Sequence, residues 1–422
     1  TGVEASQEKI LRGRSGKLKV EVNAMGRIVR EWPDPKDAAK PGEDVFLTLD
    51  AHLQRFAAEQ FGEDSGGISV IDCMTGELRT LLSMPSFDAN LFVNGLTQED
   101  MNRLNNDPKR PQFNKVIGGG YPPASTYKMV LMMAGLEQGV INPREKIPCK
   151  GKIKMGNRDF HCWLRRGHGP VDLKQALQHS CDVYFYDLAQ RLEMDAIRDM
   201  ALRLGLGQTY ELGITGQSAG LIPNPAWKRE RLGQGWRMGD SLNASIGQGF
   251  VLATPLQLAV MAARIANGRK AVSPHLIIGD EAPKFGPLNV NPEHLWRVQQ
   301  AMWSVCEEPG GTAYRHDSLG FGIVDMAGKT GTGQVRGISA SERVSGVIHN
   351  RELPWKLRDH SIFVGYAPFV APRFAAGVIV EHGGSGAGRA ANIVRGLLSK
   401  ALERDGFSKK SESNTVSGGQ PL

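Results

Sequence analysis

Apolar and polar positions alternate near both ends of the chain, whereas the middle follows a helical period. Two β-rich runs within residues 67–83 flank a Gly-containing turn, which is the pattern of a β-hairpin. Residues 142–265 show mostly helical periodicity, and an amphipathic helix is expected at 390–404. Further strands are predicted in the last third of the chain, at 321–329, 361–367 and 373–381.

Strands at both ends with helices between them indicate one sheet that is completed by segments far apart in the sequence. This arrangement predicts an α+β fold class: a central antiparallel β-sheet flanked by helices, with an all-helical subdomain inserted. Residues 1–44 are rich in charge, Gly and Pro, and are interpreted as the remnant of a small separate module. Residues 45–406 would form the main domain, and 407–422, without apolar periodicity, a disordered tail.

Composition narrows the possible partners. The 422 residues are 41% hydrophobic and 23% charged, which is typical of a globular protein with a large core. The net charge of +7 is scattered, and neither a basic stripe nor a recognition motif is present, so nucleic-acid binding is not expected. A positive surface suits a polyanionic partner such as a cell-wall polymer. The chain contains no run of about 20 apolar residues, so no membrane span is predicted within it.

The first motif with candidate catalytic side chains is Tyr121-Pro-Pro-Ala-Ser-Thr-Tyr-Lys, which leads into an apolar helix. Two prolines can precede a helix but cannot lie within it, so the helix should begin near Ser125. Positions i and i+3 share one helix face, which brings the Ser125 hydroxyl near the Lys128 amine. A hydroxyl beside a buried amine at a helix N-terminus is an arrangement that activates a weak nucleophile. A second Ser-x-x-Lys, Ser6 to Lys9, lacks the prolines and is interpreted as chance.

The second motif is Lys329-Thr-Gly-Thr, which contains the single Lys-Thr-Gly of the chain. Ser-x-x-Lys followed by Lys-Thr-Gly is the motif set of penicillin-binding proteins and class A β-lactamases. The two motifs in this order are much stronger evidence for this class of enzymes than either motif alone, because Lys-Thr-Gly by itself could simply be a strand that ends in a turn.

Together with Ser180-Cys-Asp-Val-Tyr-Phe-Tyr and Ser245-Ile-Gly-Gln-Gly, these motifs resemble the class B penicillin-binding proteins, and among them the D,D-transpeptidases of the rod-elongation machinery. The resemblance covers roughly residues 1–405. It implies the penicillin-recognising transpeptidase fold, and it makes residues 1–44 the remnant of an N-terminal pedestal domain. The membrane anchor of the family would lie outside this chain.

The resemblance also implies roles for individual residues. Ser125 would be the nucleophile and Lys128 its base, while Ser180 would relay a proton to the leaving group. Lys329 would supply a cation, and Thr330, Gly331 and Thr332 would bind the carboxylate of the substrate. The family's Ser-x-Asn motif corresponds to Ser180-Cys-Asp182, with Asp in place of Asn, although Ser241-Leu-Asn243 matches the pattern literally.

Four residues form a candidate metal site. The pattern C-x12-C-x5-H-x12-C offers three thiols and an imidazole, which suit a closed tetrahedral zinc site. The spacing is not that of a standard zinc finger, and free buried cysteines or a Cys149–Cys162 disulfide are alternatives. His161 is the alternative imidazole, and the Asp159 carboxylate is a weaker candidate ligand. Elongation-type family members resemble this chain in having a metal clip at such positions, which favours structural Zn²⁺ on Cys149, Cys162, His168 and Cys181.

The resemblance implies acyl transfer between peptidoglycan stem peptides through a serine acyl-enzyme, without an organic cofactor. β-Lactams would be covalent inhibitors, and a membrane glycosyltransferase and scaffold proteins would be partners. The expected location is the periplasmic face of the bacterial inner membrane. There are three alternatives. A β-lactamase would turn over a fluorescent penicillin, whereas a transpeptidase would keep the label. A β-lactam sensor domain is distinguished by full-length architecture, and a D,D-carboxypeptidase by its products with water against amine acceptors.

Overall fold

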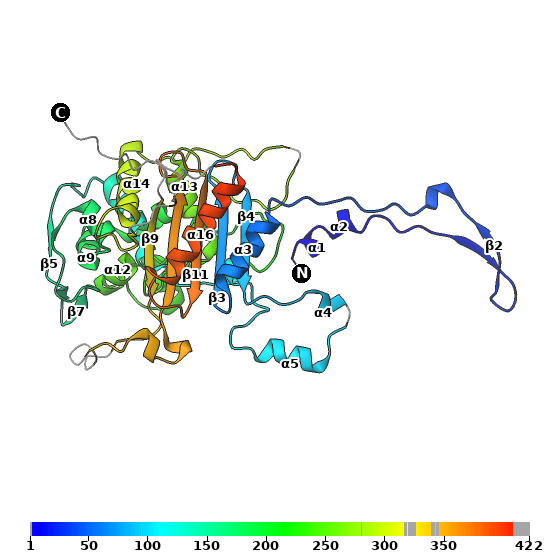
Figure 1. Ribbon diagram of the computed structural model, residues 1–422, viewed down its shortest axis with the longest axis horizontal. Helices are drawn as coiled ribbons and strands as arrows, with labels where there is room; N and C mark the ends of the chain where they lie inside the picture. The colour runs from blue at the N-terminus through cyan, green and yellow to red at the C-terminus, as the bar shows by residue number, and fades with distance from the viewer. Residues whose placement is uncertain are drawn as a thin grey trace, which may run out of the picture.

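The computed structural model describes residues 2–93, 95–279, 281–315, 319, 326–338, 342 and 346–407. Its centre is a five-stranded antiparallel sheet with the strand order β4-β3-β11-β10-β9 (Figure 1). The strands are β3 (Ser65–Asp72), β4 (Leu78–Met84), β9 (Ala327–Gly333), β10 (His360–Ala367) and β11 (Phe374–Glu381). The predicted sheet of distant segments is therefore confirmed, and β9 forms one of its edges.

Alternate side chains of each strand point to opposite faces of the sheet, and each face has its own core. On β10, Phe363 belongs to the core beneath α3 (Ala51–Phe61) and α16 (Arg389–Arg404). Its neighbours Ile362 and Val364 belong to the core beneath α13 (Pro255–Asn267). Gly377 of β11 lets α13 approach closely, because a Cβ there would lie 2.5 Å from the backbone nitrogen of Ala259. The sheet is thus buried on both faces.

The inserted subdomain carries most of the remaining helices. They are α7 (Lys128–Glu137), α8 (Leu173–Gln178), α9 (Asp182–Arg191), α10 (Met194–Arg203), α11 (Pro225–Leu232) and α12 (Met238–Ser245). The subdomain also contains two small antiparallel sheets, so the prediction of an all-helical subdomain is wrong in this respect. They are built from β5 (Ile147–Cys149), β6 (Lys152–Met155), β7 (Arg158–His161) and β8 (Gly169–Val171).

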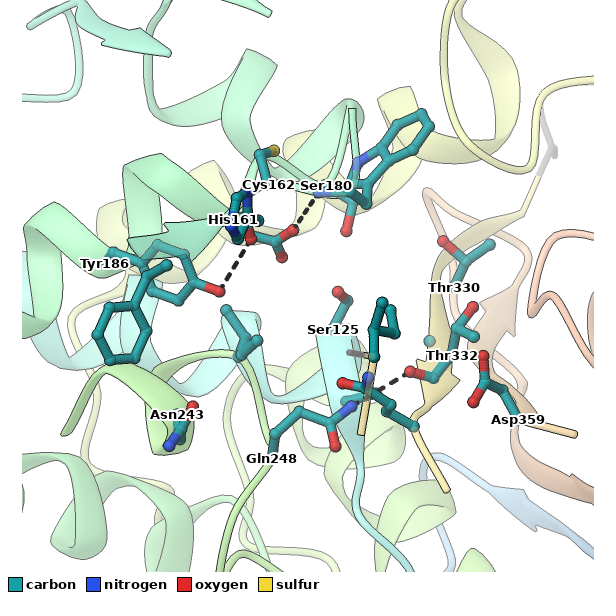
Figure 2. Close-up of a pocket in the computed structure, with 18 of the residues that line it drawn as sticks. Ser125, His161, Cys162, Ser180, Tyr186, Asn243, Gln248, Thr330, Thr332 and Asp359 are labelled. Atoms are coloured by element: carbon teal, nitrogen blue, oxygen red, sulfur yellow. Dashed lines mark hydrogen bonds between the residues drawn. The ribbon is translucent and has the colours of Figure 1, made fainter. Parts of the chain in front are cut away.

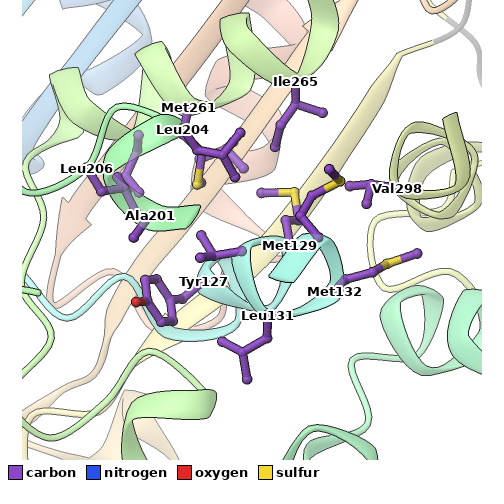
Figure 3. Close-up of a cluster of buried hydrophobic side chains, with 14 of the residues drawn as sticks. Tyr127, Met129, Leu131, Met132, Ala201, Leu204, Leu206, Met261, Ile265 and Val298 are labelled. Atoms are coloured by element: carbon purple, nitrogen blue, oxygen red, sulfur yellow. The ribbon is translucent and has the colours of Figure 1, made fainter. Parts of the chain in front are cut away.

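Helix α7 lies at the centre of the larger core. Met129, Leu131 and Met132 are buried on different sides of the helix, so the helix is enclosed all round (Figure 3). Met261 of α13 and Val298 of α14 (Pro292–Glu307) belong to the same core. A helix that is apolar on every side needs such enclosure, and the enclosure fixes its N-terminal end in space.

Shorter elements complete the described chain: α4 (Asn90–Val93), α5 (Gln98–Asn106), α6 (Lys115–Gly118), and the 3₁₀ turns η1 (Pro35–Asp37), η3 (Asn350–Glu352) and η4 (Trp355–Leu357). The N-terminal segment forms α1 (Gly2–Ser6), α2 (Glu8–Leu11) and the exposed ribbon of β1 (Lys19–Val22) and β2 (Ile28–Trp32), which extends away from the sheet (Figure 1).

Two expectations from the sequence concern the membrane and the tail. Within the described residues, none of the helices has the length and apolar character required to cross a bilayer. The tail predicted at 407–422 lies outside the described residues except for Phe407.

Candidate active site

Ser125 lies in a single 3₁₀ turn, η2 (Ala124–Tyr127), that leads directly into α7. The predicted helix therefore begins with this tight turn, and the regular α-helix starts at Lys128. Ala124 has a φ of 50°, in the left-handed region that non-glycine residues rarely adopt. Such strain persists only where the surrounding structure enforces it, and it is common at functional sites. The half-buried Ser125 hydroxyl is thereby placed at the N-terminal end of a buried helix.

Lys128 is fully buried, and its ammonium group binds three oxygen atoms. Its Nζ donates to the carbonyl oxygen of Ser180 at 2.9 Å, to Ser180 Oγ at 3.2 Å and to Asp182 Oδ1 at 2.7 Å. Ser180 also has a positive φ, of 55°, which turns its carbonyl group and its side chain toward the lysine. Within the described residues, no hydrogen bond joins Ser125 to Lys128. The structure thus brings Lys128, Ser180 and Asp182 into one network.

Asp182 has both carboxylate oxygens engaged. Oδ1 accepts from Lys128, and Oδ2 accepts from the backbone N–H of Trp163 at 2.8 Å. Burial raises the pKa of Asp182, while the Lys128 charge acts in the opposite direction. The carboxyl group therefore connects the lysine to the loop that follows β7.

Strand β9 supplies the opposite wall of the site. Lys329 is fully buried, and its Nζ donates to the carbonyl oxygen of Thr330 at 3.0 Å. Burial, together with the neighbouring charge of Lys128, lowers the pKa of Lys329 well below its usual value. The hydroxyl of Thr330 lies 2.7 Å from that of Thr312, which belongs to the segment after α14. A hydroxyl-bearing edge strand is thus held opposite the nucleophile.

These groups surround a cleft of about 560 Å³. Ser125 lies near its centre, with Thr330 and Thr332 on one side and Ser180 above it in the view of Figure 2. Of the predicted catalytic and substrate-binding residues, Ser125, Ser180, Asp182, Thr330, Gly331 and Thr332 line the cleft, as does the predicted metal ligand Cys162. Lys128 and Lys329 lie beneath its surface. The geometry joins a nucleophile, a buried cation–carboxylate network and a hydroxyl-lined strand.

The four predicted metal ligands also converge. One ligand atom from each of Cys149, Cys162, His168 and Cys181 lies within 4.8 Å of the others. His168 Nδ1 is 3.6 Å from Cys149 Sγ and 3.5 Å from Cys162 Sγ. Tetrahedral zinc with ordinary bond lengths places a nitrogen and a sulfur ligand about 3.6 Å apart. The hydrogen bond between Cys162 and Cys181 lowers the pKa of the Cys162 thiol and raises that of the Cys181 thiol, so the pair favours one thiolate, the form that binds metal.

The alternatives considered for this site fit less well. Cys149 and Cys162 are free thiols rather than a disulfide. Asp159 forms an ion pair with Lys152 at 2.6 Å. His161 lines the cleft, whereas the metal-ligand group contains His168. The three thiols and one imidazole therefore fit Zn²⁺ in number, chemistry and spacing.

Several residues of the site had no sequence signal of their own. Trp163 acts through its backbone N–H, and Thr312 through a contact with a residue 18 positions away, so neither is part of a local motif. Gln248 donates to the carbonyl oxygen of Thr332 at 3.3 Å. It belongs to the Ser-Ile-Gly-Gln-Gly segment that supported the resemblance, and this segment was the only available signal.

Residues 66–399 match the family described as "Penicillin binding protein transpeptidase domain", and residues 1–47 match "Penicillin-binding Protein dimerisation domain". The peptidoglycan D,D-transpeptidase MrdA of Acinetobacter baumannii is 36% identical over 402 residues, which are 92% of this chain and 58% of that protein. The chain spans less than two thirds of the length of such curated relatives.

Solved structures agree with this result. The complex of penicillin-binding protein 2 (PBP2) and MreC from Helicobacter pylori has a TM-score of 0.83 at 29% identity, covering 97% of this chain and 72% of that one. A structure titled "Structural coordination of polymerization and crosslinking by a peptidoglycan synthase complex" has a TM-score of 0.80 at 30% identity, covering 98% and 71%. The predicted family and transpeptidase fold are confirmed: this chain belongs to the penicillin-binding protein transpeptidases.

Proposed function

We propose that the protein is a peptidoglycan D,D-transpeptidase, which cross-links stem peptides through an acyl-enzyme on Ser125 during cell elongation and maintenance of rod shape. The observation that carries this proposal is the convergence of Ser125, the Lys128–Ser180–Asp182 network and the hydroxyls of Thr330 and Thr332 on one cleft. The curated relatives named as peptidoglycan D,D-transpeptidases support it.

In the first step, Ser125 Oγ attacks the carbonyl carbon of the penultimate D-Ala, and its proton passes to Lys128. Lys128 must be neutral to accept this proton. Its own proton can move to Asp182, because the two groups are 2.7 Å apart and burial raises the carboxyl pKa. The Ser125–Lys128 contact closes only when substrate is bound, as catalytic hydrogen bonds often do.

The leaving group and the developing charge involve the other groups of the cleft. The peptide C–N bond breaks as Ser180 delivers its proton to the amine of the terminal D-Ala and receives from Lys128, 3.2 Å away, the proton that came from Ser125; an ester on Ser125 remains. Thr330 and Thr332 hold the terminal carboxylate, beside Gly331, through hydroxyl donors. Lys329 lies beneath them and supplies a cation, which the charge of the bound carboxylate favours. The backbone N–H groups of Ser125 and Thr332 form the oxyanion hole, where one donor is worth about 3–4 kcal/mol.

The orientation of Thr332 supports this second donor. Its carbonyl oxygen accepts from Gln248 across the cleft, so it points away from β10. In an antiparallel strand, the N–H and C=O groups of one residue point to the same side. The N–H of Thr332 therefore also faces the cleft. An amine of a second stem peptide then attacks the ester, and Ser125 recovers its proton.

Four further assignments belong to this proposal. Cys149, Cys162, His168 and Cys181 would hold Zn²⁺, which supplies a structural cross-link between the catalytic loop and the loop after β7. β-Lactams would acylate Ser125. A membrane glycosyltransferase and scaffold proteins would be partners, which the solved PBP2–MreC complex and the solved peptidoglycan synthase complex support. The domain would act at the periplasmic face of the inner membrane, with 1–44 as pedestal remnant and 45–406 as transpeptidase domain.

Mass spectrometry after penicillin treatment tests the proposal. We expect one lasting adduct on Ser125, absent in Ser125→Ala. Ser6→Ala is the matched control, because Ser6 belongs to the other Ser-x-x-Lys of the chain and should keep the label. An adduct elsewhere would refute the proposed nucleophile. Rapid turnover of the label would favour a β-lactamase, and release of D-Ala with water alone as acceptor would favour a carboxypeptidase.

A further inference from the structure

The segment Ser241-Leu-Asn243 matches the Ser-x-Asn pattern but lies outside the Lys128 network. Ser241 is buried, and its hydroxyl accepts a hydrogen bond from Trp236 Nε1 at 2.8 Å, which is a packing role. Asn243, two residues later on α12, lines the cleft (Figure 2). Its side chain makes no hydrogen bond within the described part of the chain. A side-chain amide that faces a cleft without a partner is available to a ligand.

The residue in the Ser-x-Asn position of the catalytic loop cannot supply such an amide. Asp182 has no N–H group in its side chain, and its two oxygens are engaged by Lys128 and by the backbone of Trp163. A donor stem peptide has an amide bond immediately before its penultimate D-Ala. The carbonyl of that bond needs a donor, and its N–H needs an acceptor, once the peptide is removed from water.

Gln248 provides a second amide at the same side of the cleft. Its Nε2 donates to the Thr332 carbonyl at 3.3 Å, across the space between the 243–248 segment and β9 (Figure 2). That carbonyl is an outward-facing acceptor on an edge strand, where an added peptide can pair. In the free protein, Gln248 occupies the acceptor that the N–H of the donor peptide would use.

The position of these amides relative to the nucleophile is fixed by the backbone. Gly247 has a φ of 65°, and a Cβ there would lie 2.2 Å from the carbonyl oxygen of Ala124. The Ala124 N–H donates to the Gly247 carbonyl at 2.9 Å. Gln248 and Asn243 therefore belong to a segment that contacts the turn of Ser125 directly, and the backbone N–H of Gln248 is itself bonded to the Asn243 carbonyl at 3.0 Å.

We propose that Asn243 and Gln248 are specificity-determining residues that bind the amide preceding the penultimate D-Ala of the donor peptide. Asn243 donates a hydrogen bond to this amide. The N–H of the donor peptide displaces Gln248 from the Thr332 carbonyl, and the Gln248 side chain then donates to the peptide carbonyl. The inference rests on the proposed acyl transfer at Ser125 and names the substrate group that is recognised there.

Two β-lactams that share the same bicyclic ring system, only one of which has the relevant amide, test the inference. Benzylpenicillin carries an acylamido side chain, whereas 6-aminopenicillanic acid has a free amine at the same carbon. In both, Ser125 Oγ would attack the β-lactam carbonyl, and the ring nitrogen would take the proton as the C–N bond opens. The measurement is the ratio of the two second-order acylation rate constants. Asn243→Ala and Gln248→Ala should each lower this ratio about tenfold, the effect of one lost hydrogen bond.

The ratio separates recognition from structural damage, because a disturbed site slows both compounds equally. Asn243→Asp keeps the shape but loses the N–H donors, and it should behave like Asn243→Ala. Gln190→Ala is the matched control: its amide also caps a backbone carbonyl, that of Tyr186 at 3.1 Å, but lies outside the cleft. Its ratio should equal that of wild type.

Unchanged ratios in both cleft variants, with the wild-type protein acylated at Ser125, would overturn this inference and leave the proposed function standing. A lowered ratio in Gln190→Ala would also overturn it, since the effect would not be specific to the cleft. A wild-type protein that reacts with neither compound would overturn the proposed function and this inference together.

Discussion

Removal of the Asp182 carboxylate should destabilise the protein strongly, because Lys128 would remain buried without its counter-ion. The two groups are 2.7 Å apart, Lys128 is fully buried and the Asp182 side chain is only 11% exposed. Breaking a buried ion pair by removing one partner costs about 3–5 kcal/mol. Asp182→Ala should therefore lower the free energy of unfolding by about this amount.

Asp182→Asn should have a smaller effect. The asparagine oxygen can accept from either Lys128 or the Trp163 N–H, but its NH₂ group then faces the remaining donor. Loss of one hydrogen bond to a charged group costs about 1.5–3 kcal/mol. The ordering of wild type, Asp182→Asn and Asp182→Ala is thus determined by how many donors each side chain can satisfy.

Urea denaturation at neutral pH, with zinc at a constant saturating concentration, measures these differences. Asp187→Asn is the matched control, because Asp187 lies on the same helix and forms a half-exposed ion pair with Arg191. Surface ion pairs are worth about 0–1 kcal/mol, so this variant should differ little from wild type. If Asp182→Ala were as stable as Asp187→Asn, the buried ion pair would not contribute as argued.

Three other predictions follow from the site and its surroundings. Cys162→Ser should lower bound zinc, melting temperature and acylation rate together, whereas Cys73→Ala, outside the cluster, should keep the zinc content that metal analysis detects. Equal zinc in both variants would contradict the metal site. Gly247→Ala should reduce stability by more than about 1 kcal/mol and slow acylation, because the added Cβ meets Ala124 and the φ is positive; unaltered acylation would show that this contact does not position the nucleophile. Burial lowers the pKa of His360 from 6.5 to about 4, so the folded protein binds fewer protons than the unfolded chain between these values. Stability should accordingly fall by roughly 2 kcal/mol from pH 7 to pH 5, and His360→Gln should remove that part of the pH dependence in urea titrations; an identical slope in the variant would refute the assignment.

Much of the fold follows from local pattern. The hairpin at β3–β4 and the strands β10 and β11 were predicted because a strand buried on one or both faces needs a short run of β-branched and apolar residues. The two small sheets of the subdomain were missed, since strands of three or four residues such as β5 and β6 lie within a segment whose overall period is helical.

The sequence by itself determined which groups are candidates for the chemistry. Ser125 and Lys128 are one helical turn apart, and Cys149, Cys162, His168 and Cys181 have the donor types that zinc requires. Residue type and spacing nominated these groups, and the Lys-Thr-Gly motif and the family resemblance selected them over the alternatives. Only the tertiary structure decided what these groups contact. The Trp163 N–H on Asp182, and the Gln248 amide on the Thr332 carbonyl, join segments that no local period connects. Such contacts depend on the packing of a buried helix against a distant edge strand, which is a property of the whole core.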